Sequence, residues 1–176
     1  MLIKELVEDK SGKTPTFYLK NENIKIDRKL LSFLEDYSLK NQNIDVRICV
    51  HKNKNSKHHS MVLLQNKNNY YRPHKHKSKG DTFLILKGKL ACFLFNNRGK
   101  IKFKCVLKKN EIFRTPNNTF HAVMPLTKKV LYFETKKGPF LKKNDSIFAS
   151  WSPSIKENKS KTEDYKNMLF KSINEI

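Results

Sequence analysis

The sequence predicts a mainly β fold, a jelly-roll barrel with one helix before it and a short helix after it. Two observations carry this prediction. Between residues 46 and 136 the apolar residues recur in short strand-length runs, and turn-forming residues separate the runs. No helix of crossover length interrupts them, which counts against a parallel α/β sheet and favours an antiparallel barrel. The predicted strands are residues 46–50, 60–65, 82–86, 90–95, 101–107, 111–115, 121–124 and 129–135, with turns at 66–69, 79–80, 87–88, 96–99 and 117–118.

Residues 1–45 are expected to form a strand and a helix that pack on the barrel. Residues 17–19 are the apolar part of a short strand-forming segment. A helix should follow, because Asp27 can cap its N-terminus and the apolar residues from Leu30 to Tyr37 recur at helical spacing on one face. We expect that face to plug one end of the barrel.

The barrel is predicted to occupy residues 46–153, and residues 154–176 to form a linker and a second helix. After Trp151 the composition turns to Lys, Asn, Ser and Glu, so residues 154–161 resemble a linker. An amphipathic helix is predicted from Glu163 to Ile173. Thr162 can cap it, and two acidic residues would lie in its first turn.

The chain is strongly basic, with a formal net charge of +21 at pH 7. Only five of its 37 basic residues are arginine, the residue that reads base edges and binds phosphates in a bidentate manner. The lysines are scattered along the chain instead of forming a basic arm. We therefore interpret the charge as solvated surface, expect no nucleic-acid partner, and expect small anionic molecules to be attracted.

The cysteines and the N-terminus predict a cytoplasmic protein. Cys49, Cys92 and Cys105 lie far apart and each falls in an apolar, strand-like run, which indicates buried reduced thiols. Charge interrupts the first residues, so they do not resemble a signal peptide. No apolar run approaches the length of a membrane span, so we expect no membrane partner.

Four residues form a candidate metal site. His74 and His76 are two residues apart, so on a strand their imidazoles point to the same face. Asp81 follows across a turn at Gly80, and His121 opens a later strand. Three imidazoles and one carboxylate suit a divalent Fe, Mn, Ni, Co or Zn ion with positions left open for water or substrate.

These residues resemble the two motifs of the cupin superfamily. The pattern H-x-H-x4-acid-x6-G, followed by P-x-(G/N)-x2-H, occurs as His74, His76, Asp81, Gly88 and then Pro116, Asn118, His121. More closely, the chain resembles the WbuC family of cupin-fold metalloproteins. The matching pieces are residues 47–51, 71–76, 95–99, Glu134 with 138–140, and 151–153, in family order. The cupin carboxylate is usually Glu, so the shorter Asp81 either binds the metal directly, reaches it through water, or orients a histidine.

The resemblance implies a double-stranded β-helix, one bound divalent metal ion and an association with surface polysaccharides such as O-antigen. We expect a metal-dependent enzyme, isomerase- or epimerase-like, that acts on a sugar or sugar nucleotide. An Fe(II) oxygenase and a non-catalytic metal- or ligand-binding module are the alternatives. The resemblance also implies a homodimer and a small anionic or sugar-like ligand.

Five further residues are expected around the pocket. His51 would act either as a general acid or base or as a hydrogen-bonded structural histidine. Arg72 would either contact an anionic group or form a surface salt bridge. The complete set is His51, Tyr71, Arg72, Arg114 and Glu134.

Overall fold

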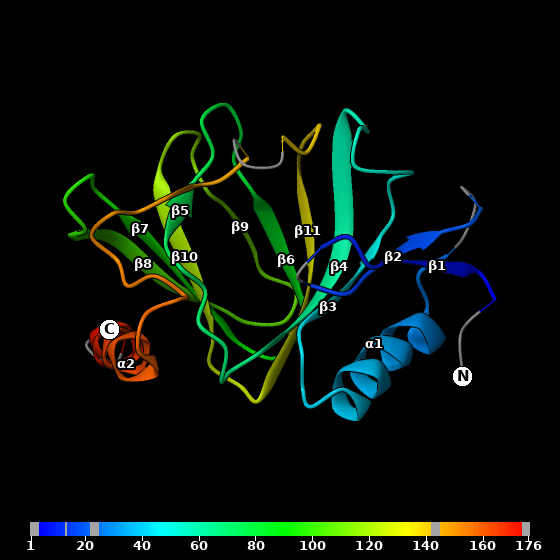
Figure 1. Ribbon diagram of the computed structural model, residues 1–176, viewed down its shortest axis with the longest axis horizontal. Helices are drawn as coiled ribbons and strands as arrows, with labels where there is room; N and C mark the ends of the chain where they lie inside the picture. The colour runs from blue at the N-terminus through cyan, green and yellow to red at the C-terminus, as the bar shows by residue number, and fades with distance from the viewer. Residues whose placement is uncertain (1–3, 13, 22–24, 142–144, 174–176) are drawn as a thin grey trace.

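The computed structural model describes residues 4–12, 14–21, 25–141 and 145–173, and its strands form two sheets that curl into a barrel (Figure 1). All strand pairs are antiparallel except β2 with β3. The elements are β1 (Leu6–Asp9), β2 (Thr16–Leu19), α1 (Arg28–Lys40), β3 (Val46–Cys49), β4 (His58–Asn66), β5 (His74–Lys75), β6 (Thr82–Lys87), β7 (Leu90–Phe95), β8 (Ile101–Leu107), β9 (Ile112–Arg114), β10 (Phe120–Pro125), β11 (Lys129–Lys137), β12 (Ile147–Phe148) and α2 (Lys159–Ile173).

The order of the strands is that of a jelly roll. One sheet runs β1-β2-β3-β4-β11-β6-β9, and the other runs β12-β5-β10-β7-β8. The antiparallel pairs β4 with β11, β5 with β10, β6 with β9 and β7 with β8 arise when a long eight-stranded hairpin folds back and wraps into a barrel. The chain therefore has the double-stranded β-helix fold of the cupin type that the sequence predicted.

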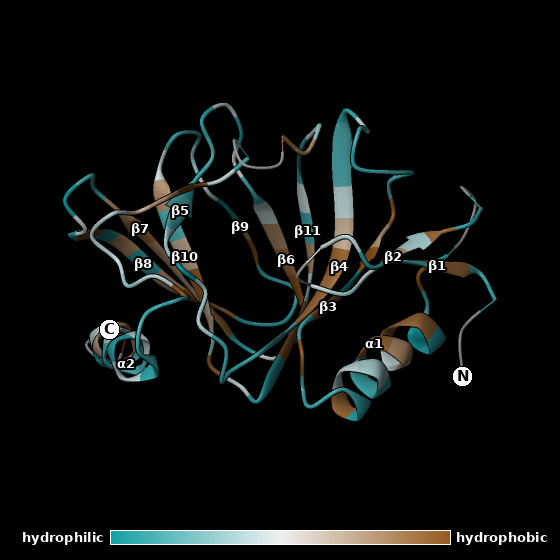
Figure 2. Cartoon of the chain, in the orientation of Figure 1, coloured by the Kyte–Doolittle hydropathy of each residue, from teal (hydrophilic) through white to brown (hydrophobic). Residues whose placement is uncertain are grey.

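Side-chain alternation explains why the barrel strands were predictable. Each predicted barrel strand begins and ends within two residues of an observed strand. Alternate residues face the barrel interior, where Phe83, Ile85 and Tyr132 form an apolar cluster. In Figure 2 the lower part of β4 is hydrophobic and its upper part is hydrophilic, so one end of the barrel is polar.

Helix α1 packs on the outer face of the seven-stranded sheet, and the prediction that it plugs one end of the barrel is wrong. Asp27 caps the helix as predicted, because its carboxylate accepts two backbone N–H hydrogen bonds of 3.0 and 3.2 Å. Leu34 is fully buried in a cluster that includes Leu131 of β11. The next residue, Tyr132, belongs to the interior cluster. Neighbouring strand residues face opposite ways, so the helix lies outside the barrel.

Helix α2 begins four residues earlier than predicted. Thr162 lies inside the helix, where its hydroxyl donates to the carbonyl of Lys159 at 2.8 Å, so it is not the N-cap. Instead, the side-chain oxygen of Asn158 accepts a 3.1 Å hydrogen bond from the N–H of Ser160. Lysine is a good helix former, which extends the helix into the segment predicted as a linker. No helix within the described residues is long and apolar enough to cross a membrane.

Candidate metal centre

The predicted metal ligands meet at one end of the barrel. His74 of β5 and His121 of β10 are register partners, and their ring centroids lie 4.6 Å apart. His76 and Asp81 lie in the connection between β5 and β6. The Asp81 Oδ2 atom lies 3.0 Å from His121 Nε2 and 3.2 Å from His76 Nε2. The ligand atoms of all four residues lie within 4.8 Å of one another, so the cluster can hold a metal ion.

Backbone carbonyls fix the orientation of all three imidazoles. A carbonyl oxygen only accepts hydrogen bonds, so each Nδ1 beside one carries the hydrogen and each Nε2 keeps its lone pair. Metal-binding histidines are usually held in this way. The pairs are His74 Nδ1 with the Arg72 carbonyl at 3.1 Å, His121 Nδ1 with the Thr119 carbonyl at 3.0 Å, and His76 Nδ1 with the Asp145 carbonyl.

Two atoms of the cluster show that it fits a cation. The Nε2 of His76 and the Oδ1 of Asp81 are buried and have no hydrogen-bond partner. Their residues are 2% and 3% exposed, and an unsatisfied buried polar group costs about 1–3 kcal/mol. Three neutral imidazole nitrogens and one carboxylate are also a donor set that divalent transition metals prefer. The residues present therefore fit a divalent metal ion.

A largely buried lysine that no sequence pattern had distinguished lies beside the cluster. The Lys136 ammonium is 2.8 Å from Glu134 Oε1 and 3.5 Å from Asp81 Oδ1. Burial acts to lower the pKa of Lys136, but the two carboxylates outweigh burial and raise it. Burial acts to raise the pKa of Asp81, but the Lys136 ammonium and the two neighbouring histidines hold it well below its ordinary value. Lys136 and Asp81 therefore face each other as charged groups at neutral pH.

A second buried ion pair supports the cluster from the C-terminal side. Lys79 donates to Asp145 Oδ1, and the backbone carbonyl of Asp145 holds His76. The Asp145 carboxylate also accepts a 3.1 Å hydrogen bond from a backbone N–H. Three residues later, Phe148 of β12 pairs with His74 of β5, and the two rings lie 5.9 Å apart. The segment from Asp145 to Phe148 therefore contacts two of the three histidines.

Lys79→Met should lower metal affinity about 10- to 100-fold, the usual range for residues that orient metal ligands. The substitution leaves the buried Asp145 carboxylate without its ammonium partner, so the carbonyl that fixes His76 loses its support. Competition with a chelator measures the affinity. Lys77→Met, an exposed neighbour, is the matched control and should bind metal as the parent does. Equal affinities for the two variants would contradict this role for Lys79.

Arg72 and Tyr71, both predicted to line the pocket, make contacts with other parts of the fold. The Arg72 guanidinium donates to the carbonyls of Ala149 at 2.8 Å and Ser152 at 3.3 Å. The Tyr71 hydroxyl lies 3.0 Å from the Oδ1 of Asp45. These contacts tie Arg72 to the C-terminal segment and Tyr71 to a partly buried polar network, and the pocket roles of both residues stay predictions.

The other three residues predicted for the pocket lie in different parts of the fold, and of these only Glu134 is connected to the metal cluster. His51 stacks on His59 with ring centroids 4.1 Å apart, and its Nδ1 lies 3.1 Å from the amide nitrogen of Ser60. Arg114 is exposed on β9. Glu134 is connected to the metal cluster through its ion pair with Lys136.

The free energy of unfolding should decrease as the pH falls from about 6.5 towards 4. Burial, together with the His51 ring stacked on it, lowers the pKa of His59 from 6.5 to about 4. Between these values the unfolded chain binds more protons than the folded one, so acid favours unfolding.

Thermal unfolding midpoints recorded from about pH 7 to about pH 5 check this pH dependence. His59→Gln should weaken the dependence, and the exposed His58→Gln should leave it unchanged. The same slope in His59→Gln as in the parent would contradict the assignment.

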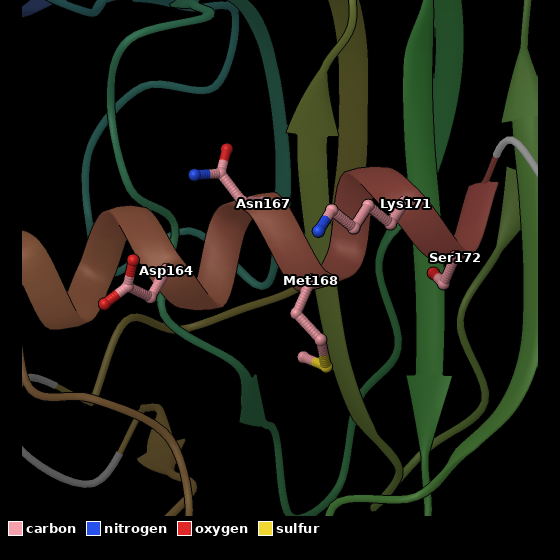
Figure 3. A pocket seen from close by; sticks show the side chains of 5 residues that line it. All are labelled: Asp164, Asn167, Met168, Lys171 and Ser172. Atoms are coloured by element: carbon pink, nitrogen blue, oxygen red, sulfur yellow. The ribbon is translucent and has the colours of Figure 1, made fainter.

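A surface hollow on α2 lies apart from the residues predicted for the site. Figure 3 shows the five side chains that line it, all from α2, and none of them is a predicted site residue. The hollow therefore does not change the location of the candidate centre. The lining residues are Asp164, Asn167, Met168, Lys171 and Ser172.

Comparison with known proteins gives one family match and many structural similarities. Residues 26–107, a little under half of the chain, match the family model described as a domain of unknown function, DUF6016. No curated protein sequence matches the chain.

Three of the solved structures that are similar to this chain are compared with it by sequence identity, coverage and TM-score. KdgF from a Halomonas species is 17% identical over 54% of this chain and 80% of its own, with a TM-score of 0.44. A Klebsiella pneumoniae protein with a double-stranded β-helix domain is 15% identical over 60% of this chain and 79% of its own, with a TM-score of 0.46. Oxalate decarboxylase from Bacillus subtilis is 11% identical over 60% of this chain, with a TM-score of 0.49. This chain covers only 27% of that enzyme.

Proposed function

We propose that this protein is a metal-dependent cupin enzyme that acts on a small anionic, sugar-like substrate. The observation that carries the proposal is the convergence of three imidazoles and one carboxylate, with each Nδ1 held by a backbone carbonyl. A divalent ion held by His74, His76, Asp81 and His121 would supply Lewis acidity to polarise a substrate carbonyl oxygen. The donor set suits Fe, Mn, Ni, Co or Zn, and the metal content of the purified protein identifies which of them is bound.

The charges around the cluster favour an anionic substrate. The carboxylates of Asp81, Glu134 and Asp145 face the ammonium groups of Lys79 and Lys136. These groups carry one net negative charge, which a divalent ion would convert to one net positive charge. The formal charge of +21 on the whole chain adds attraction over a longer range.

Glu134 is the residue that we assign to proton transfer. Its side chain is buried beside the cluster, and the Lys136 ammonium lies 2.8 Å away. A carboxylate at this position can accept a proton from a carbon next to the polarised carbonyl and return it, which is the chemistry of an isomerase or epimerase. Lys136 can stabilise negative charge that develops on the substrate.

The sugar assignment rests on the resemblance to the WbuC family. That resemblance favours a sugar or sugar nucleotide that is used in the synthesis of cell-surface polysaccharide. Proton transfer next to a carbonyl is a reaction that such substrates commonly undergo. An Fe(II) oxygenase would instead consume oxygen, and a ligand-binding module would turn nothing over.

The test uses untagged protein whose metal content is measured by mass spectrometry. The metal-loaded protein is then incubated in D2O with phosphorylated ketoses and nucleotide-linked keto sugars, and NMR follows deuterium incorporation. We expect metal-dependent exchange at the carbon next to the carbonyl, which Glu134→Gln should abolish while it retains the metal. Oxygen consumption without deuterium exchange would contradict the proposal and favour an Fe(II) oxygenase. Tight substrate binding without either reaction would favour a non-catalytic ligand-binding module.

Asp81→Ala should lower metal affinity about 10- to 100-fold, and Asp81→Glu should retain it. The carboxylate is within hydrogen-bonding distance of two of the proposed ligand nitrogens, so its removal deletes an oxygen from the donor set. Glu keeps the charge and is the usual cupin residue. Affinity is measured by competition with a chelator. If Asp81→Ala bound metal as tightly as the parent, the centre would be a three-histidine site and Asp81 would belong to the turn.

A further inference from the structure

The fold places two of the three cysteines directly opposite each other. Cys92 of β7 and Cys105 of β8 are register partners in an antiparallel pair. Opposite residues in such a pair have Cα atoms about 4.5–5.5 Å apart. A disulfide spans Cα separations of about 4.4–6.8 Å, so the two backbones already lie at a bonding separation.

The two side chains also share one environment. Cys92 belongs to the apolar cluster inside the barrel, and Cys105 packs against the same cluster. Cys92 is buried, whereas Cys105 is partly exposed on β8, which is an edge strand of its sheet. The neighbouring Cys92 thiol lowers the pKa of Cys105, which favours the nucleophilic thiolate on the more accessible of the two residues.

We propose that Cys92 and Cys105 form a reversible cross-strand disulfide, which makes this strand pair an oxidation site. The sequence pattern predicts buried reduced thiols at all three cysteines. Their pairing depends on the alignment of β7 with β8, which sequence spacing alone did not indicate. The inference does not depend on the metal centre.

The chemistry is balanced with a peroxide as the oxidant. The Cys105 thiolate attacks one peroxide oxygen and breaks the O–O bond, which leaves a sulfenic acid and, after protonation, one water. The Cys92 sulfur then attacks the sulfenic sulfur, loses its proton and displaces a second water. One peroxide and two thiols therefore give one disulfide and two waters, and a dithiol reductant returns both thiols.

The test treats the folded full chain with hydrogen peroxide in the presence of a chelator. The protein is then denatured, the remaining thiols are alkylated, and the products are mapped by mass spectrometry. We expect three alkylated cysteines before oxidation, Cys49 alone afterwards, and a linked peptide that joins Cys92 to Cys105. Dithiothreitol should restore all three alkylation sites.

Two variants serve as matched controls. Cys49→Ser should still form the link, because Cys49 lies in the other sheet. Cys105→Ser should leave Cys92 alkylatable after oxidation, and its thermal unfolding should be cooperative if the variant has folded. Oxidation of folded protein that leaves three free thiols would overturn the proposal. A link through Cys49, or oxidation of Cys105 to a sulfinic acid without a link, would also overturn it.

Discussion

His121→Ala should abolish stoichiometric metal binding. The His121 ring lies close to both other candidate imidazoles, with centroids 4.6 Å from the His74 ring and 5.7 Å from the His76 ring. Its Nε2 also lies 3.0 Å from Asp81 Oδ2. Because loss of a residue that only orients a ligand costs about 10- to 100-fold in affinity, loss of one of the three imidazole ligands should cost at least about 100-fold.

Metal content after gel filtration, together with chelator competition, measures the effect. His58→Ala is the matched control, because this substitution also removes one imidazole from the chain but does so at an exposed position. His58→Ala should retain one metal ion per chain. Full occupancy in His121→Ala would show that the four-residue cluster is not the metal site.

The candidate ligands were predictable because local spacing determines most of their geometry. His74, His76 and Asp81 lie within one strand and the turn that follows it, so the chain brings them together without long-range information. His121 could be added to the candidate ligands because it completes the second cupin-like motif, which begins at Pro116. The barrel strands could also be predicted from the sequence, because an interior apolar face imposes a two-residue period on each of them.

The charged residues around the ligands were not predictable in the same way. Lys136 and Lys79 resemble the many surface lysines of a basic chain, and no local pattern distinguishes them. Lys136 reaches the site because β11 pairs with both β4 and β6, and Lys79 is buried because Asp145 returns from far along the chain. Both placements depend on long-range pairing.

Closeness in sequence to His74 was the only basis for the pocket role of Arg72, and that role stays a prediction. Arg72 lies two residues before His74, but it precedes β5 and is not part of the strand. The alternation of strand side chains does not extend to it, and its guanidinium turns to the segment that carries Ala149. The strand expected to carry His74 and His76 is β5, which covers only His74–Lys75. Strand β12 was missed, since two residues are too few to show a period.

Lys136→Met should destabilise the metal-free protein by about 3–5 kcal/mol, the usual cost of removing one partner from a buried ion pair. The Lys136 and Glu134 side chains are 16% and 9% exposed, so solvent screens their ion pair only weakly. Without the ammonium, the buried carboxylates of Glu134 and Asp81 lose the cation that lies between them.

Chemical denaturation in the presence of a chelator measures this loss. Lys137→Met removes the exposed neighbouring lysine and should change the free energy of unfolding by no more than about 0.5 kcal/mol. Adding Glu134→Gln to Lys136→Met should recover part of the stability, because it removes one of the two uncompensated charges. A divalent ion should also stabilise Lys136→Met more than it stabilises the parent, since the ion supplies positive charge beside the Asp81 carboxylate. If Lys136→Met were as stable as Lys137→Met, the ion pair would contribute nothing to the folded barrel.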